Sequence, residues 1–311
     1  MLSVFFKDIP SERFVKVRNS NIRYCMFESS TQDNYQSSTN VILLHGGGAS
    51  LDWWAPNLNA IAENHCVYAL DLIGSGYSDK PKVSYSFDYL AEFIKDFMDT
   101  LDIESAVLVG QSAGGGVALK FAINFPERIE KLILISSVGL DQRMTFGMRL
   151  ATLPLIGEFM TYPHRNIIAQ MMKQAVFNSD LITEELIEFS YQTLNLPQAQ
   201  AAYLNLLRSN GNFWGWHSDF VDSITSNLKF IQTNTLIIWG EQDKLVPIDW
   251  VKSAIEHFPN AHLSVFKMCG HWPSIEHSEM FNKLVCEFLG SVEKNSNEQK
   301  NSIINQFGIA E

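Results

Sequence analysis

The stretch Val107-Leu108-Val109-Gly110-Gln111-Ser112-Ala113-Gly114-Gly115-Gly116 decides the fold. Its apolar start predicts a buried strand at Ala106–Val109, and the glycines predict a sharp turn into a helix at Val117–Asn124. A serine in such a turn has its hydroxyl pushed clear of the backbone, and glycines on either side remove side chains that would collide there. A bare G-x-S-x-G pattern occurs by chance in about one such chain in ten, but its strand and helix context makes this one specific. Ser112 is therefore the predicted nucleophile, rather than part of an ordinary glycine-rich turn.

Short β-rich runs alternate with helical patterns outward from this motif. Helical periodicity is clearest between Phe87 and Leu101, where apolar residues recur at i, i+3, i+4 and i+7. Continuous apolar runs of strand length suit a parallel sheet that is covered on both faces. We predict a mostly parallel, eight-stranded α/β sheet flanked by helices. The strands are expected at Phe14–Val17, Ile22–Phe27, Val41–Leu44, Cys66–Leu70, Ala106–Val109, Leu132–Ile135, Leu236–Trp239 and Leu263–Phe266.

The alternation stops between residues 138 and 230, where no convincing strand occurs and methionines and aromatic residues are frequent. An insertion of this length predicts a helical cap after the sixth strand, not a structureless loop. We therefore expect an α/β core at residues 1–137 and 231–290, a cap at 138–230, and a flexible C-terminal tail at 291–311. The cap aromatics either line a pocket or only pack the cap on the core.

The bulk composition narrows the function classes. The chain has 311 residues, 46% of them hydrophobic, and a formal net charge of −11. Such a charge argues against nucleic-acid binding, which needs a basic surface. The four cysteines show no metal-ligand spacing, and no signal peptide or membrane-length apolar segment is found. We expect a cytoplasmic protein with a small apolar acyl substrate and without cofactor or metal; a homodimer is left open.

A second motif, His45-Gly46-Gly47-Gly48, directly follows the strand at Val41–Leu44. Three glycines let backbone N–H groups approach a substrate without side-chain obstruction. We predict that the N–H groups of Gly47 and Ala113 form an oxyanion hole. The alternative, a phosphate loop, lacks the G-K-[ST] ending.

Two further motifs follow late strands and supply the partners that a serine nucleophile needs. They read Trp239-Gly240-Glu241-Gln242-Asp243-Lys244 and Met268-Cys269-Gly270-His271-Trp272-Pro273. A serine hydroxyl is activated by an imidazole that accepts its proton, and a carboxylate fixes the imidazole tautomer. We predict His271 as base and Asp243 as acid. Glu241 and Asp141 are alternative acids.

Taken together, these motifs resemble the α/β-hydrolase superfamily from about residue 12 to 290. The resemblance rests on HGGG at 45–48, GQSAG at 110–114, GEQD at 240–243 and GHWP at 270–273. The stretch DLIGSGYSD at 71–79 resembles a turn of this family, and we interpret it as structural support for the oxyanion loop. The resemblance implies an α/β-hydrolase fold and an acyl-enzyme mechanism. A serine in place of an aspartate nucleophile excludes haloalkane dehalogenase and epoxide hydrolase chemistry.

Two C-terminal segments, TLIIWGEQDKLVP at 235–247 and CGHWPSIEHSEMFNKLV at 269–285, resemble the meta-cleavage product hydrolases, which break C–C bonds. Trp272 fits that group. Two departures count against it. An asparagine expected near Trp54–Ala55 is replaced, and the cap arginine expected near Pro197–Tyr203 is absent, with Arg208 as the nearest candidate.

An acidic substrate is bound poorly without a placed cation. A carboxylesterase for small-to-medium apolar esters is therefore the first hypothesis and a C–C hydrolase the alternative. A non-catalytic receptor on the same fold is a third. His217 in the cap is a possible further contact. The expected substrate contacts are Gly48, Gln111, Trp214 and Trp272.

Overall fold

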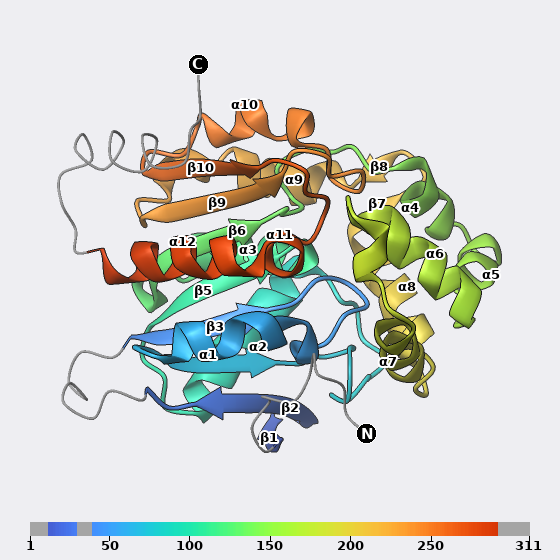
Figure 1. Cartoon of the computed structure of the whole chain (residues 1–311), viewed down its shortest axis with the longest axis horizontal. Coiled ribbons are helices and arrows are strands. Elements are labelled where there is room, and N and C mark those ends of the chain that lie inside the picture. The colour runs from blue at the N-terminus through green and yellow to red at the C-terminus, as the bar shows by residue number, and fades with distance from the viewer. Residues whose placement is uncertain (1–11, 30–38, 292–311) are drawn as a thin grey trace.

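An eight-stranded sheet forms the centre of the molecule in the computed structural model, which describes residues 12–29 and 39–291. Its strand order is β1-β2-β4-β3-β5-β6-β9-β10, and only β2 runs antiparallel to its neighbours (Figure 1). The predicted, mostly parallel eight-stranded sheet is confirmed. The strands are β1 Arg13–Val17, β2 Ser20–Phe27, β3 Asn40–Leu44, β4 Cys66–Leu70, β5 Ala106–Gln111, β6 Ile129–Ile135, β9 Thr235–Gly240 and β10 Ala261–Phe266.

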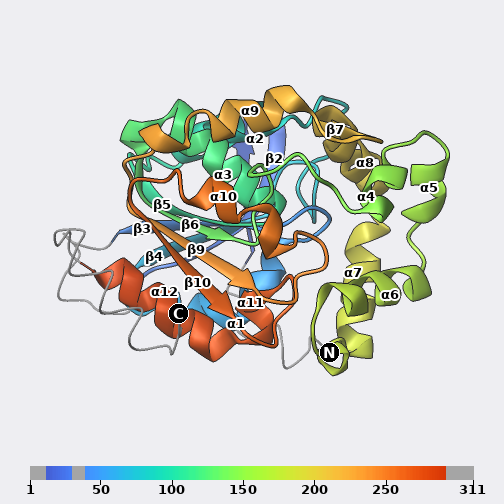
Figure 2. The same cartoon turned by 90° about the horizontal axis from the view of Figure 1, so that it is seen from above.

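Both faces of the sheet are buried, which is why its strands read as continuous apolar runs. In β3, Ile42 and Leu44 join the apolar cluster on one face, while Val41 and Leu43 join the cluster on the other. Figure 2 shows the resulting three layers. One face is covered by α1 Ala55–Ala62 and α12 Ser278–Gly290, and the other by α2 Phe87–Thr100, α3 Ala113–Asn124 and α9 Ser218–Thr225.

The helix α2 shows how the sequence pattern produces this packing. It begins after Ser86, whose hydroxyl accepts a hydrogen bond from the N–H of Tyr89 at 3.2 Å. Such an N-cap satisfies one of the free N–H groups at the helix start. Residues at helical spacing, including Leu90, Ile94 and Phe97, are buried against the sheet. The periodicity seen in the sequence therefore marks the core face of α2.

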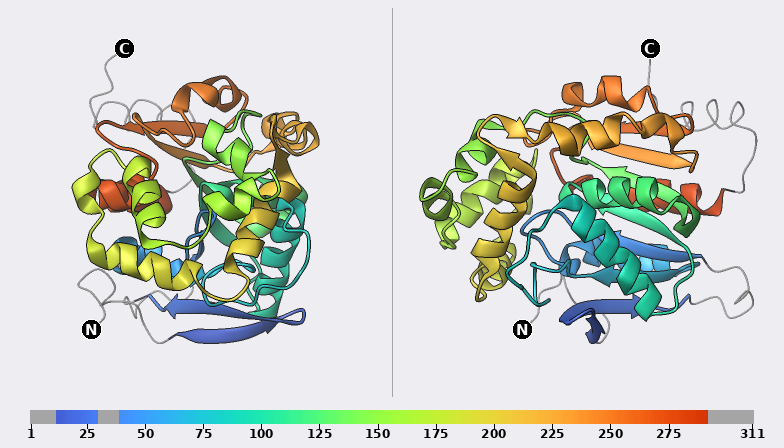
Figure 3. Two further views of the ribbon diagram at one scale, coloured as in Figure 1. Left: turned by 90° about the vertical axis from the view of Figure 1, so that its right-hand side faces the viewer. Right: turned by 180° about the vertical axis from the view of Figure 1, so that it is seen from behind.

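A group of helices follows β6 and lies together at one end of the sheet (Figure 3). They are α4 Phe146–Ala151, α5 Ile156–Met160, α6 Arg165–Ala175, α7 Glu184–Leu194 and α8 Ala199–Asn210. The expectation of no strand in this interval was wrong in one detail, because the two-residue strands β7 Gly211–Asn212 and β8 Gly215–Trp216 pair there. The helix α9 packs on the core instead, where Phe220 stacks on Phe87 at 4.3 Å. The cap limits 138 and 230 stay a prediction, and this packing favours an earlier end.

The remaining helical segments are short. Among the described residues they include α10 Lys252–Ile255, α11 Pro273–Glu276 and five single turns of 3-10 helix, of which η2 Leu51–Trp54 concerns the site. Within residues 12–29 and 39–291, no helix has the length and apolar character needed to cross a membrane. The predicted C-terminal tail lies outside the described residues, apart from its first residue.

Candidate active site

Ser112 lies in the turn between β5 and α3 with a strained backbone. Its φ of 54° and ψ of −114° fall in a region that non-glycine residues rarely occupy, at a cost of about 1–3 kcal/mol. Backbone hydrogen bonds hold it there: the Ser112 N–H donates to the Ile135 carbonyl at 2.8 Å, and the Ser112 carbonyl accepts from Gly115 and Val138. The turn fixes the side chain at the start of α3, as the motif predicts.

Two glycines make this turn possible by allowing very close backbone contacts. A Cβ atom at Gly110 would lie 2.4 Å from the carbonyl oxygen of Gly114, and a Cβ atom at Gly114 would lie 2.2 Å from the carbonyl oxygen of Leu44. Neither distance is compatible with a side chain. The glycines therefore bring the start of α3 directly against β3 and β5.

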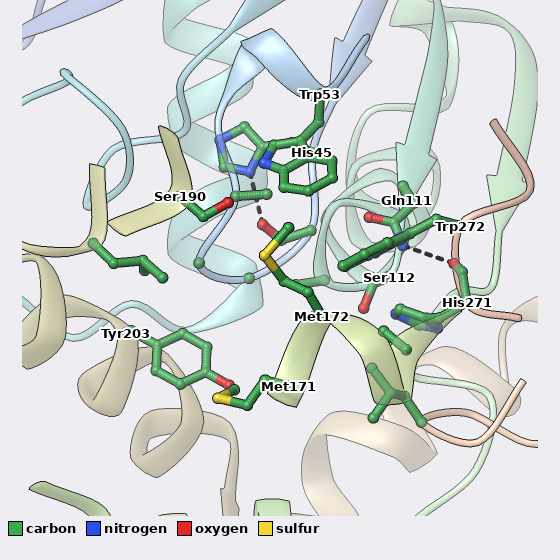
Figure 4. A pocket seen from close by; sticks show the side chains of 18 of the residues that line it. His45, Trp53, Gln111, Ser112, Met171, Met172, Ser190, Tyr203, His271 and Trp272 are labelled. Carbon is green, nitrogen blue, oxygen red and sulfur yellow. Dashed lines mark hydrogen bonds between the residues drawn. The ribbon is translucent and has the colours of Figure 1, made fainter. Parts of the chain in front are cut away.

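His271 and Asp243 form a buried pair that follows the ends of β10 and β9. His271 Nδ1 lies 2.8 Å from Asp243 Oδ2, and the Asp243 side chain is fully buried. The other carboxylate oxygen accepts hydrogen bonds from the N–H groups of Leu245 and Val246 at 2.8 and 2.9 Å. With Nδ1–H donating to the carboxylate, Nε2 is left free as a proton acceptor. Figure 4 shows the Ser112 hydroxyl beside the His271 ring.

The two alternative acids lie elsewhere. Asp141 forms an ion pair with Arg143 at 2.8 Å, and Glu241 accepts a hydrogen bond from Gln242 at 2.6 Å. The ring of His271 is oriented by Asp243 and not by either of them. The structure thus brings together Ser112, Asp243 and His271.

The loop that carries His271 is tied to the cap. The His271 N–H donates to the carbonyl of Ala175, at the end of α6, at 2.7 Å. The carboxylate of Glu276 accepts from the N–H of Gly270 at 2.8 Å and from that of Phe177 at 2.7 Å. Glu276 was not anticipated from the sequence, although its position five residues after His271 offered a signal. These contacts fix the histidine against the pocket wall.

His45 orients the glycine loop. Its Nε2 accepts a hydrogen bond from the Leu72 N–H at 3.0 Å, so the proton lies on Nδ1, which donates to the Gly46 carbonyl at 2.7 Å. Burial lowers the pKa of His45 and keeps the ring neutral. In a trans peptide, the Gly46 carbonyl and the Gly47 N–H point in opposite directions. Holding the carbonyl on the histidine therefore turns the Gly47 N–H away from it.

The predicted oxyanion donors face the same pocket. Gly47 and Ala113 both line it, and a Cβ atom at Gly47 would lie 3.8 Å from the Cβ atom of Ala113. Among the hydrogen bonds of the described residues, neither N–H has an acceptor. Free N–H groups beside a nucleophile can stabilise an oxyanion.

A buried ion cluster supports the glycine loop from behind. Arg23, on β2, binds both carboxylate oxygens of Asp52 at 2.7 and 2.9 Å and lies 3.3 Å from Asp71. Asp71 also accepts hydrogen bonds from the N–H groups of Leu51 and Tyr77, both at 2.7 Å. Leu51 and Asp52 belong to η2, directly after the glycine loop. The structural role predicted for the 71–79 turn agrees with these contacts, whereas Arg23 was not anticipated.

A cavity of about 240 Å³ opens beside Ser112 and His271. Gly48, Gln111 and Trp272 line it, as expected for substrate contacts. Trp214 does not: it lies in the turn between β7 and β8, is 82% exposed, and lines a separate hollow with Arg208 and His217. The prediction for Trp214 was wrong because its turn directs the indole away from the cavity.

The described lining of the cavity holds no acidic or basic side chain other than the two histidines. Within the described part of the chain, its lining contains no arginine or lysine. Arg208 instead forms an ion pair with Glu158 at 2.7 Å and donates to the Thr152 carbonyl. No group of three or more His, Cys, Asp or Glu side chains in residues 12–29 and 39–291 could hold a metal ion. The expectation of a metal-free protein stays a prediction.

Comparison with known proteins agrees with this architecture. The family model described as alpha/beta hydrolase fold matches residues 39–278. The chain belongs to the α/β-hydrolase family. This α/β-hydrolase is 32% identical, over 81% of its length and 87% of the relative, to the 2-hydroxy-6-oxononadienedioate/2-hydroxy-6-oxononatrienedioate hydrolase of Comamonas testosteroni. It is 31% identical, over the same shares, to the 2-hydroxy-6-oxo-6-phenylhexa-2,4-dienoate hydrolase of Burkholderia cepacia.

A solved structure is similar as well. A variant of the meta-cleavage product hydrolase from Pseudomonas fluorescens IP01 superposes with a TM-score of 0.75 at 27% identity. The match covers 89% of this chain and 97% of that one. The α/β-hydrolase fold predicted from the four motifs is therefore confirmed.

Proposed function

We propose that this α/β-hydrolase is a serine hydrolase that breaks a carbon–carbon bond next to a ketone. The similarity to two curated hydrolases over four fifths of the chain carries the proposal. The substrate named for the Burkholderia cepacia relative bears a ketone, a hydroxyl and a carboxylate, but no ester, thioester or amide. Its hydrolysis must therefore cleave a C–C bond. Trp272 in the cavity lining is consistent with the same class.

The proposed first half-reaction acylates Ser112. His271 Nε2 takes the hydroxyl proton, and Ser112 Oγ bonds to the ketone carbon, whose oxygen becomes an oxyanion held by the N–H groups of Gly47 and Ala113. Collapse of this intermediate breaks the C–C bond, and His271 gives its proton to the departing carbon. Asp243 stays ionised and stabilises the imidazolium. The 2.8 Å contact between His271 and Asp243 supports these roles.

The second half-reaction releases the acid. His271 takes a proton from water, the resulting hydroxide attacks the acyl carbon, and the Ser112 ester bond breaks with return of the proton to Oγ. The chemistry needs three side chains and two backbone donors. We expect no metal or cofactor to take part.

A second candidate, a carboxylesterase for small-to-medium apolar esters, is favoured by one observation. The described cavity lining holds no arginine or lysine, and Arg208 is engaged by Glu158. A dienoate carboxylate buried there without a cation would be bound weakly. Esters without a free carboxylate avoid this penalty.

Parallel kinetics separate these candidates. We would measure kcat/KM for 2-hydroxy-6-oxo-6-phenylhexa-2,4-dienoate and for p-nitrophenyl butyrate, with Ser112→Ala as the control. Faster turnover of the dienoate, reduced on the order of 10⁶-fold in the variant, is expected. Preference for the butyrate would establish the esterase instead. No turnover, together with no labelling of Ser112 by a fluorophosphonate, would indicate a non-catalytic protein on this fold.

A further inference from the structure

Two polar side chains in the active-site cavity lack hydrogen-bond partners. Ser190, on α7, is only 5% exposed, and its buried hydroxyl has no partner. Tyr203, on α8, is partly buried and lines the same cavity, and no hydrogen bond joins its hydroxyl to another described residue. Burial raises the pKa of Tyr203, so its hydroxyl stays protonated. Buried polar groups are nearly always hydrogen-bonded, so the unpaired Ser190 hydroxyl, with the Tyr203 hydroxyl in the same cavity lining, is a sign of a missing ligand.

Both side chains come from the cap and lie toward the glycine loop. A ring carbon of Tyr203 is 3.5 Å from the position of a Cβ atom at Gly48, and the same ring is 3.5 Å from that position at Gly47. Figure 4 shows Ser190 and Tyr203 on one side of Ser112 and His271 on the other. The polar pair is thus separated from the proposed base by the nucleophile.

If Ser112 forms the acyl-enzyme proposed above, this arrangement places the leaving group and the acyl part of a substrate on opposite sides of Ser112. His271 must protonate the leaving group, so the leaving group lies on the histidine side. The acyl part then extends in the opposite direction, toward Ser190 and Tyr203. Met171 and Met172 line the space between and provide an apolar wall.

We propose that Ser190 and Tyr203 form an uncharged polar subsite that binds a neutral oxygen, a keto or hydroxyl group, on the acyl part of the substrate. Each hydroxyl can donate a hydrogen bond to a neutral oxygen within its reach. A carboxylate is excluded there because the described lining offers no arginine or lysine to pair with it. An entirely apolar acyl chain is disfavoured because it leaves both hydroxyls unpaired.

Paired p-nitrophenyl esters test the subsite, since activated esters acylate the same serine. The pairs are 5-oxohexanoate with hexanoate, 6-oxoheptanoate with heptanoate, and 7-oxooctanoate with octanoate, with mono-p-nitrophenyl adipate as the charged member. In at least one pair, kcat/KM for the oxo ester should exceed that for the alkyl ester about tenfold. The adipate should be slower than either.

Two variants and one control test whether Ser190 and Tyr203 cause the preference for the oxo esters. Ser190→Ala and Tyr203→Phe should each reduce the oxo preference about five- to tenfold and change the alkyl ester less than about twofold. Tyr191→Phe removes a hydroxyl from a neighbouring residue outside the cavity lining and should leave the ratio unchanged. A ratio that persists in both folded variants overturns the assignment.

The outcomes separate the subsite from the proposed function. Ester hydrolysis without any oxo preference, or no ester hydrolysis while a fluorophosphonate still labels Ser112, overturns the subsite alone. Absence of both hydrolysis and labelling overturns the acyl-enzyme function itself. Faster hydrolysis of the adipate than of every neutral ester would show that the subsite accepts a carboxylate and refute its neutral character.

Discussion

Replacing Arg23 with glutamine should destabilise the protein by about 3–5 kcal/mol, because it removes one partner from a buried ion cluster. Arg23 is 2% exposed and pairs with Asp52 and Asp71, whose carboxylates are also buried. Without the guanidinium, both carboxylates lose their counter-charge. The matched control is Arg18→Gln, which breaks a half-exposed pair with Asp96 and should cost no more than about 1 kcal/mol.

Urea unfolding followed by circular dichroism, at pH 5 and pH 7.5, measures both effects. Burial raises the pKa of Asp71, and Arg23 opposes that rise. In Arg23→Gln the pKa of Asp71 rises further above its unfolded value. A carboxyl with a raised folded-state pKa contributes stability at low pH that is lost as the pH increases. The stability gap between wild type and Arg23→Gln should therefore be larger at pH 7.5 than at pH 5.

The same variant reports on the glycine loop at residues 46–48, which carries a proposed oxyanion donor. Asp52 lies in η2, directly after the glycine loop, so loosening it should lower kcat more than it raises KM in the folded fraction. Equal unfolding midpoints for Arg23→Gln and Arg18→Gln would refute the reasoning. A gap that widened at pH 5 would contradict the assignment of the cost to unpaired carboxylates.

Three further predictions concern the site, two of them with a control substitution. His45→Ala should reduce kcat about 10²-fold, because it releases the Gly46 carbonyl. The control His257→Ala, at an exposed position, should leave kcat unchanged, and steady-state kinetics measures both effects. Asp243→Asn should lose about 10⁴-fold in kcat and Asp141→Asn almost nothing, and the reverse order would reassign the acid. Arg208→Gln should leave the ratio of kcat/KM for the dienoate to kcat/KM for the ester unchanged, because Arg208 pairs with Glu158 outside the cavity. Loss of dienoate turnover in this variant would show that Arg208 contacts the substrate.

The parts of the molecule that the sequence predicts well are those set by local backbone chemistry. The apolar run before Gly110 forms β5, and the serine turn follows because only glycine fits at positions 110 and 114. Asp243 and His271 are recognisable because each follows a buried strand, and the ends of parallel strands meet at one edge. Residues that are neighbours in the sequence determine these features, so hydrophobic periodicity and short motifs are sufficient to predict them.

The cap was harder to predict because its side chains are directed by contacts between helices. Trp214 was expected in the cavity on composition alone, yet the β7–β8 turn exposes it. Tyr203 lies in the segment that the sequence analysis noted only for its missing arginine, and packing over Gly47 and Gly48 brings it into the cavity. Arg23 was missed for a related reason, since its buried partners, Asp52 and Asp71, lie 29 and 48 residues away.

Hydrogen bonds and a buried ion cluster connect the proposed reacting groups to the surrounding elements. His45 holds the carbonyl of the peptide whose N–H is the proposed oxyanion donor, and the Arg23 cluster holds the helical turn that follows it. Glu276 and the Ala175 carbonyl hold the His271 loop against α6, which also supplies Met171 and Met172 to the cavity. A displacement of α6 large enough to reshape the cavity would break the hydrogen bond from the His271 N–H and shift the proposed base. The shape of the cavity and the position of the proposed base are therefore linked through α6, and preorganised groups stabilise a transition state only where they are already fixed.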